Sequence, residues 1–322
     1  MRFLIAGLGS IGRRHLRNLL ALGERDIVLY RTHQSTLPDD ELAEFPTETD
    51  LQRALTHYRP DAVIVANPTS HHLDVALPAA RAGCHLLLEK PIAHTLNGLE
   101  TFRQTVAENH VRVLVGFQFR FHPTLNAVRR WLHQGLIGTP WFVRAHWGEY
   151  LPDWHPWEDY RQSYAARADL GGGVVRTLCH PLDYLRYLLG EAQVIWAHTG
   201  NLSTLELQGV EDFAEIGLRF SGGAEASIHL DYFQRPPQHW LEIEGAAGTI
   251  RWEYASGQAV ALAPDHSLLA SAALPPSWER NAMFLDEMRH FLAVVRGESQ
   301  PRCTLEDGIR ALSLALNALS AR

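Results

Sequence analysis

Residues 3–12 decide the fold, and they read Phe3-Leu4-Ile5-Ala6-Gly7-Leu8-Gly9-Ser10-Ile11-Gly12. The first four residues form a short apolar run typical of a buried strand, and a helix-length stretch follows the glycines as far as Gly23. Glycines at this G-x-G-x-x-G spacing permit a tight turn and let a pyrophosphate approach the backbone at a helix N-terminus. The stretch therefore predicts a dinucleotide-binding turn made by Gly7, Gly9, Ser10, Ile11 and Gly12.

Apolar strand-like runs alternate with helical patterns over the first third of the chain. Such runs occur at residues 27–30, 61–66, 84–88 and 111–115. Repeated strand and helix units predict a parallel sheet with right-handed crossovers. The predicted fold class is therefore α/β, with an N-terminal Rossmann domain, a doubly wound parallel sheet, over residues 1–121.

The pattern changes in residues 122–322. Residues 214–220 and 224–232 alternate apolar side chains with polar residues or glycine, and residues 241–244 and 249–252 flank a glycine-rich turn. This alternation is typical of antiparallel strands with one buried face and one free face. Thr304 is a plausible N-cap of a last helix. We predict a second, α+β domain with a largely antiparallel sheet.

Bulk properties exclude several classes of protein. The length of 322 residues favours two domains, and the net charge of −7 argues against nucleic-acid binding. The N-terminus resembles neither a secretory signal nor a membrane span, so a cytoplasmic protein is expected. Three scattered cysteines and eighteen histidines form no recognisable ligand frame, so no disulfide and no metal site is predicted.

The second strand-like run ends in Tyr30-Arg31-Thr32, about where a carboxylate holds the ribose hydroxyls in NAD-binding proteins. No carboxylate is present there, and Arg31 could pair with a 2′-phosphate instead. The alternative is an ordinary exposed arginine in an arginine-rich chain. The sequence thus favours NADP over NAD as cofactor.

Lys90 is the only lysine among 29 basic residues, and it follows a strand-like run in Glu89-Lys90-Pro91. Lysine loses its proton more readily than arginine and presents a compact donor. Ligands bind at the carboxyl ends of strands in open α/β sheets. We therefore expect a chemical role for Lys90, although codon bias could also leave one lysine by chance.

Two stretches of the second domain offer further polar chemistry. His180 and Asp183 follow a glycine turn and are spaced to share a helix face; His180 could equally be a structural histidine at a helix start. Residues 148–160 are rich in aromatic and acidic side chains, including Tyr150 and Trp154. Such side chains suit sugar rings, but a structural loop covering the sheet is an equal interpretation.

In order along the chain, the motifs are the glycine turn, Ala66-Asn67-Pro68-Thr69 with His72, Glu89-Lys90-Pro91, and residues 116–123 with Arg120. Together they resemble the Gfo/Idh/MocA oxidoreductases over most of the chain. The resemblance implies a catalytic Lys90, often before a cis proline, and a nicotinamide side lined by Glu89, Asn67, Pro68, Thr69 and His72. It also implies an open-faced sheet used for dimerisation.

One departure from the family pattern concerns the substrate. The family has an aspartate one turn before the histidine that matches His180, and here that place holds Arg176 or Thr177. A simple inositol or glucose substrate is therefore disfavoured.

These observations predict an NAD(P)-dependent dehydrogenase or reductase acting on a sugar, sugar derivative or sugar nucleotide. Lys90 and His180 are the catalytic candidates, and Arg120, Tyr150, Trp154 and Asp183 are the substrate-binding candidates. The protein is expected to be a homodimer or homotetramer without nucleic-acid or membrane partners. The first alternative is a non-catalytic protein that senses a dinucleotide and a sugar; an oxidoreductase of a tetrapyrrole-like substrate is another.

Overall fold

The computed structural model describes residues 1–32, 37 and 40–321. The chain divides into two compact units, one of Met1–Gln118 with Asn281–Arg310 and the other of Phe119–Arg280 with Ala311–Arg322. The first division falls close to the expected boundary at residue 121. Residues 281–310, however, join the first unit and not the second, because an amphipathic helical pattern does not reveal which sheet the helix will cover.

The first unit contains a six-stranded sheet in the order β3-β2-β1-β4-β5-β6. Its strands are β1 (Phe3–Ala6), β2 (Ile27–Tyr30), β3 (Thr47–Glu48), β4 (Ala62–Val65), β5 (His85–Leu88) and β6 (Val113–Val115). All of them pair in parallel. Every residue of β1 and β4 is buried, which explains why these strands are continuous apolar runs. The predicted Rossmann sheet is confirmed.

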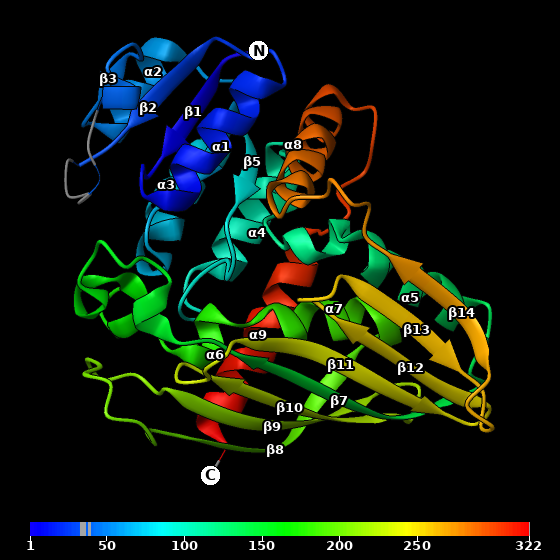
Figure 1. Ribbon diagram of the computed structural model, residues 1–322. Coiled ribbons are helices and arrows are strands. Elements are labelled where there is room, and N and C mark those ends of the chain that lie inside the picture. The colour runs from blue at the N-terminus through cyan, green and yellow to red at the C-terminus, as the bar shows by residue number, and fades with distance from the viewer. Residues whose placement is uncertain (33–36, 38–39, 322) are drawn as a thin grey trace. The chain divides into compact units, whose positions relative to one another are not determined.

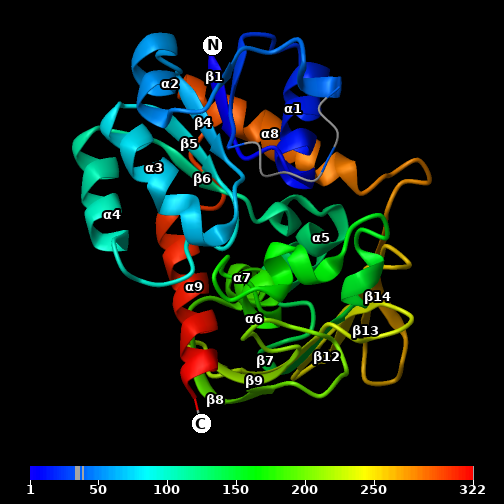
Figure 2. The same cartoon turned by 90° about the vertical axis from the view of Figure 1, so that its left-hand side faces the viewer.

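Helices cover both faces of this sheet. They are α1 (Ser10–Ala21), α2 (Leu51–Tyr58), α3 (His72–Arg81), α4 (Leu99–Glu108) and α8 (Asn281–Arg296). Figure 2 shows α1 and α8 on one side of the sheet and α3 and α4 on the other. The guanidinium of Arg14 lies 4.4 Å from the ring centre of Phe284, and the Asn281 amide donates to Asn18 Oδ1 at 2.9 Å. These contacts hold α8 against α1.

The second unit is built on an eight-stranded sheet in the order β14-β13-β12-β11-β7-β10-β9-β8 (Figure 1). Its strands are β7 (Pro140–Gly148), β8 (Ala192–Gly200), β9 (Phe213–Phe220), β10 (Glu225–Asp231), β11 (Gln238–Gly245), β12 (Gly248–Glu253), β13 (Gln258–Leu262) and β14 (Leu268–Ala273). Only the pair β7–β10 is parallel, so the largely antiparallel prediction is confirmed. Strands β8, β13 and β14 were not predicted.

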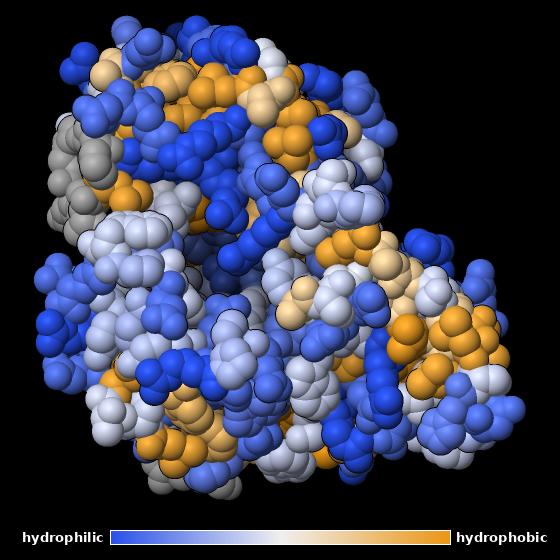
Figure 3. Space-filling view, in the orientation of Figure 1, coloured by the Kyte–Doolittle hydropathy of each residue, from blue (hydrophilic) through white to orange (hydrophobic). Residues whose placement is uncertain are grey.

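One face of this sheet is covered by α5 (Pro123–His133), α6 (Val174–Thr177) and α7 (His180–Leu189). Val143, Ala145 and Trp147 of β7 are buried on that face, whereas Arg144 between them is exposed on the other. In Figure 3, hydrophobic residues gather over the end of the sheet formed by β13 and β14, where Leu268 is 61% exposed. The second face of the sheet is therefore open and bears charged and aromatic side chains.

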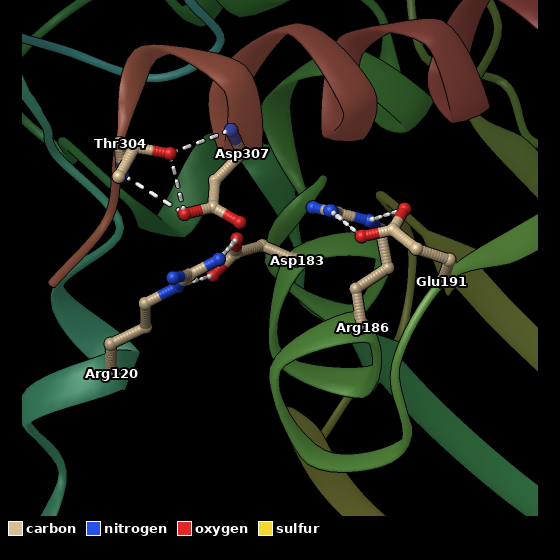
Figure 4. Close-up of polar contacts among 6 residues, drawn as sticks. All are labelled: Arg120, Asp183, Arg186, Glu191, Thr304 and Asp307. Carbon is tan, nitrogen blue, oxygen red and sulfur yellow. Dashed lines mark hydrogen bonds and ion pairs between the residues drawn. The ribbon is translucent and has the colours of Figure 1, made fainter.

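Helix α9 (Leu305–Ser320) begins with a reciprocal cap (Figure 4). The Asp307 amide donates to Thr304 Oγ1 at 3.2 Å, and the Thr304 amide donates to Asp307 Oδ2 at 2.9 Å. Both bonds satisfy backbone donors at the helix start, so the predicted N-cap is confirmed. No helix in the described ranges is long and apolar enough to cross a membrane.

Candidate active site

The glycine turn at the start of α1 is shaped by close backbone contacts. Gly7 has a φ of +90°, and a Cβ there would clash with the backbone of Ala66 and Asn67. A Cβ at Gly12 would clash with the carbonyl of Gly7, whereas a Cβ at Gly9 would meet nothing within 4 Å. Helix α1 has no acidic residue in its first turn and no side-chain cap. Its N-terminal amides are therefore suited to a pyrophosphate.

The segment after β4 is held by its own side chains. The Asn67 amide donates to the His71 carbonyl at 2.8 Å, and His72 Nε2 donates to the Asn67 carbonyl at 2.9 Å. Burial lowers the pKa of His72 to about 4, although the backbone of Asn67 and Pro91 opposes this effect. His72 is thus a buried neutral ring that connects this segment with the one after Lys90. Pro68 is half-buried and Thr69 is buried.

Glu89 and Lys90 follow β5 directly, and the Lys90–Pro91 peptide bond is cis. Glu89 Oε1 lies 2.8 Å from His15 Nε2, and Glu89 Oε2 accepts the Lys90 amide at 3.2 Å. Burial alone would raise the pKa of Glu89, but the hydrogen bond and charge of His15 hold it below 4.5. A Cβ at Gly116 would lie 3.1 Å from the Glu89 carboxylate. Glu89 is therefore an ionised, closely packed support for the backbone at Lys90.

A second buried acid, Glu287 of α8, lies in the same unit. It is 0% exposed, and neither carboxylate oxygen has a hydrogen-bond partner in the described part of the chain. Burial and the negative charge of Glu89 raise its pKa well above 4.5. Burial and the Glu89 charge thus favour the protonated form of Glu287. A helical pattern gives no sign that one of its acids will be buried.

Arg31 follows β2 and is only 8% exposed. Its amide donates to the Glu48 carbonyl at 3.1 Å. Glu48 itself lies beside Tyr30 in the register of β3, and its carboxylate is paired with Arg53 at 3.2 Å. The nearby acid is thus already engaged with a cation, and Arg31 is more buried than an ordinary surface arginine.

His180 begins α7 in the second unit and is 3% exposed. Its ring stacks on Trp147 at 5.2 Å and meets the Phe119 ring edge-on at 5.0 Å. His239 also stacks on Trp147, at 4.1 Å, and burial lowers its pKa well below 6.5. His180 is therefore fixed in orientation by a wall of aromatic rings.

Arg120 and Asp183 form a buried fork, as Figure 4 shows. Arg120 Nε donates to Asp183 Oδ2 at 3.0 Å, and its Nη2 donates to Oδ1 at 2.6 Å. The two side chains are 4% and 1% exposed. A carboxylate in the core needs a fixed cation for charge balance, and Arg120 supplies it. The fork anchors the first turn of α7, which carries His180.

The loop of residues 148–160 contains Tyr150 and Trp154, the two remaining candidates for substrate binding. Tyr150 is half-buried, and the guanidinium of Arg235 lies 4.1 Å from its ring centre. Trp154 packs edge-on against Tyr232 at 5.6 Å, and its indole N–H has no partner among the described residues. That indole nitrogen is itself buried, although the Trp154 side chain as a whole is half-buried.

Sequence reasoning missed Glu211, which lies at the glycine turn before α6. The Val175 amide donates to Glu211 Oε1 at 3.0 Å, and a Cβ at Gly173 would lie 2.6 Å from that oxygen. Burial raises the pKa of Glu211. The glycine turn before α6 thus contacts the Glu211 carboxylate, which comes from a distant part of the chain. Helix α6 is also where Arg176 or Thr177 stands in place of the family's aspartate. No local sequence pattern predicts the contact between Glu211 and this turn.

Comparison with known proteins agrees with this arrangement. The description "Oxidoreductase family, NAD-binding Rossmann fold" matches residues 1–117, and "GFO/IDH/MocA C-terminal domain" matches residues 125–251. The chain belongs to the Gfo/Idh/MocA family of oxidoreductases. The predicted resemblance and the predicted enzyme class are confirmed.

Curated relatives match along nearly the whole chain. Myo-inositol 2-dehydrogenase of Thermotoga maritima is 27% identical over 99% of this chain and 95% of its own. D-apiose dehydrogenase of Paraburkholderia graminis is 29% identical over 99% of this chain and 87% of its own.

Solved structures share the fold. The WlbA dehydrogenase of Bordetella pertussis, in complex with NADH and UDP-GlcNAcA, is 23% identical with a TM-score of 0.80, covering 99% of this chain and 97% of its own. Levoglucosan dehydrogenase, in complex with NADH and levoglucosan, is 18% identical with a TM-score of 0.84, covering 99% and 97%.

Proposed function

We propose that this family member transfers a hydride between NADP(H) and a hydroxyl or carbonyl carbon of a sugar, sugar derivative or sugar nucleotide. The observation that carries the proposal is Lys90. It is the only lysine of the chain and follows β5, an inner strand of the parallel sheet, beside a buried, ionised Glu89. Bound nicotinamide would supply the hydride donor or acceptor.

In this proposal the first unit holds the dinucleotide. The turn at Gly7, Gly9 and Gly12 receives the pyrophosphate at Ser10 and Ile11, where the amides of α1 begin. The segment of Asn67, Pro68, Thr69 and Glu89 borders the nicotinamide, with His72 as its support. Arg31 meets the 2′-phosphate and creates the preference for NADP over NAD.

The chemical roles follow from the properties of the side chains. Lys90 donates a hydrogen bond to the reacting oxygen and stabilises its alkoxide character. His180 carries the proton, since an imidazole can both accept and donate one. Arg120 and Asp183 position His180 through the start of α7.

A sugar-like substrate is supported by two independent features. Tyr150 and Trp154 are half-buried in a loop rich in aromatic and acidic side chains, and such side chains suit sugar rings. Relatives of similar length are named for dehydrogenation of myo-inositol and D-apiose. The absence of the family's aspartate at Arg176 and Thr177 favours a substrate other than simple inositol or glucose.

The test is a turnover assay with NADPH, NADP⁺, NADH and NAD⁺ against a panel of sugars, polyols and sugar nucleotides, following the absorbance of the reduced cofactor. His180→Ala should lower kcat by about 100-fold or more with an active substrate. His133→Gln, at an exposed histidine of α5, is the matched control and should not change kcat.

A second candidate function is a sensor that binds a dinucleotide and a sugar without chemistry. The replaced aspartate at Arg176 and Thr177 favours it, because a carboxylate that would place a substrate hydroxyl is missing. Saturable binding of NADPH and of a sugar, without turnover of any substrate in either direction, would favour this sensor over the enzyme.

For assembly, we propose a homodimer or homotetramer that pairs through the open face of the eight-stranded sheet. This face exposes Trp196 (46%) and a row of charged residues that includes Arg144 and Arg251. A monomer in analytical ultracentrifugation at micromolar concentration would contradict the proposal.

A further inference from the structure

The open face of the eight-stranded sheet carries a row of neighbouring side chains from five adjacent strands. In register, His198 of β8 faces Glu215 of β9, Glu215 faces His229 of β10, His229 faces His146 of β7, and His146 faces Trp240 of β11. Residues at one register position share a face of the sheet. A hollow on this face is lined by Glu215, His229, His146 and Trp240.

Three residues of this face present ligand atoms at one point. His146, His229 and Asp231 each offer one nitrogen or oxygen, all within 4.8 Å of one another. His229 Nε2 and Asp231 Oδ2 are already 3.0 Å apart. Two ligands of a tetrahedral zinc ion lie about 3.3 Å apart, given metal–ligand bonds of about 2.0–2.1 Å. The His146 ring stacks on His229 at 4.5 Å and on Trp240 at 5.4 Å, so the His146 side chain would have to turn out of this stack to complete such a set.

The surroundings orient two of the three ligands. Glu215 Oε1 lies 2.6 Å from His229 Nδ1 and accepts its proton, which leaves His229 Nε2 directed at Asp231. Asp231 Oδ1 accepts the backbone amides of Phe233 at 2.8 Å and Gln234 at 2.6 Å, which leaves Oδ2 as the remaining oxygen. A carboxylate behind a histidine, and amides behind a carboxylate, are typical of metal ligands.

A nitrogen without a partner points to a ligand at this place, and a glycine makes room for the Asp231 carboxylate. His146 Nε2 is buried and has no hydrogen-bond partner among the described residues. A Cβ at Gly148 would clash with the Asp231 carboxylate, so glycine leaves room for that group. An imidazole nitrogen without a partner is costly unless something binds it.

We propose that His146, His229 and Asp231 bind one divalent transition-metal ion, with Zn²⁺ as the best-suited metal. Two imidazoles and a carboxylate form a ligand set that Zn²⁺ accepts, with a fourth position left to water or another ligand. With both histidines neutral, the two charges of the ion are balanced by Asp231 and Glu215. The sequence did not predict this site because its ligands come from β7 and β10, which meet only in the sheet.

The proposal is tested with the full-length protein, independently of any substrate. Protein expressed with added zinc should contain one Zn²⁺ per chain by mass spectrometry of the metal. After removal of metal with a chelator, isothermal titration with Zn²⁺ should show one site, and Co²⁺ should give the intense visible bands of four-coordinate cobalt. His146→Gln and His229→Gln should each weaken binding about 100-fold, and Glu215→Gln about 10- to 100-fold.

His133→Gln is the matched control, because it removes an exposed histidine of the same unit far from this row in sequence. It should leave Zn²⁺ affinity unchanged. Absence of saturable Zn²⁺ uptake by the wild type overturns the proposal. Equal uptake by the wild type and both histidine variants also overturns it, since the ion would then bind elsewhere.

Discussion

Replacing the buried acid of α8 should change how stability depends on pH. Glu287 is 0% exposed, lacks hydrogen-bond partners among the described residues, and has a pKa raised well above 4.5 by burial and by Glu89. The folded protein therefore keeps this proton while the unfolded chain loses it near pH 4.5. Stability from Glu287 is fully present below that pH and is lost as pH rises toward the folded pKa.

Glutamine has a similar shape and never ionises, so the Glu287→Gln variant should not lose this stability as pH rises. The free energy of unfolding of the variant, relative to wild type, should rise by about 1.4 kcal/mol for each pH unit above the unfolded pKa. The rise should stop once pH exceeds the folded pKa. For a unit of this size, each kcal/mol corresponds to roughly 2–4 °C in Tm, so the variant should gain about 3–6 °C per pH unit over wild type.

Scanning calorimetry of both proteins between pH 5 and 8 measures this gap. Glu298→Gln is the matched control, because Glu298 lies just after α8 and is exposed. Its free energy of unfolding should stay within about 0.5 kcal/mol of that of the wild type at every pH. A gap between Glu287→Gln and wild type that stays constant from pH 5 to 8 would refute the argument that Glu287 is neutral when folded.

Three further changes test the proposed site. Lys90→Arg should lose nearly all turnover yet bind NADPH normally, because guanidinium cannot reproduce a compact, titratable donor; activity within a few-fold of wild type would contradict this. In fluorescence titration the wild type should bind NADPH roughly 10- to 100-fold more tightly than NADH. The Arg31→Asp variant should bind NADH more tightly than NADPH. Equal dissociation constants of the wild type for the two cofactors would refute the role of Arg31. Asp183→Asn should destabilise the second unit by about 3–5 kcal/mol, because it leaves the Arg120 charge buried and unpaired. A change under about 1 kcal/mol in urea unfolding would show that solvent reaches the pair.

Features with a local cause were predictable from the sequence. The glycines of residues 7–12 meet a backbone requirement within one turn, and β1 and β4 are continuous apolar runs because both faces of a parallel sheet are covered. The strict alternation in β9 and β10 reflects one buried face, and Thr304 caps α9 through a residue three positions away. The uniqueness of Lys90 is likewise visible in the composition alone.

Other features depend on which segments meet, and only the tertiary structure decided them. Asp183 lies in the core against Arg120, and a pairing across 63 positions leaves no local pattern in the sequence. Helix α8 joins the first unit, and His146 and His229 become neighbours only through the parallel pairing of β7 with β10. Sequence periodicity predicts which face of a helix or strand is buried, whereas chain topology and packing decide which other segment covers that face.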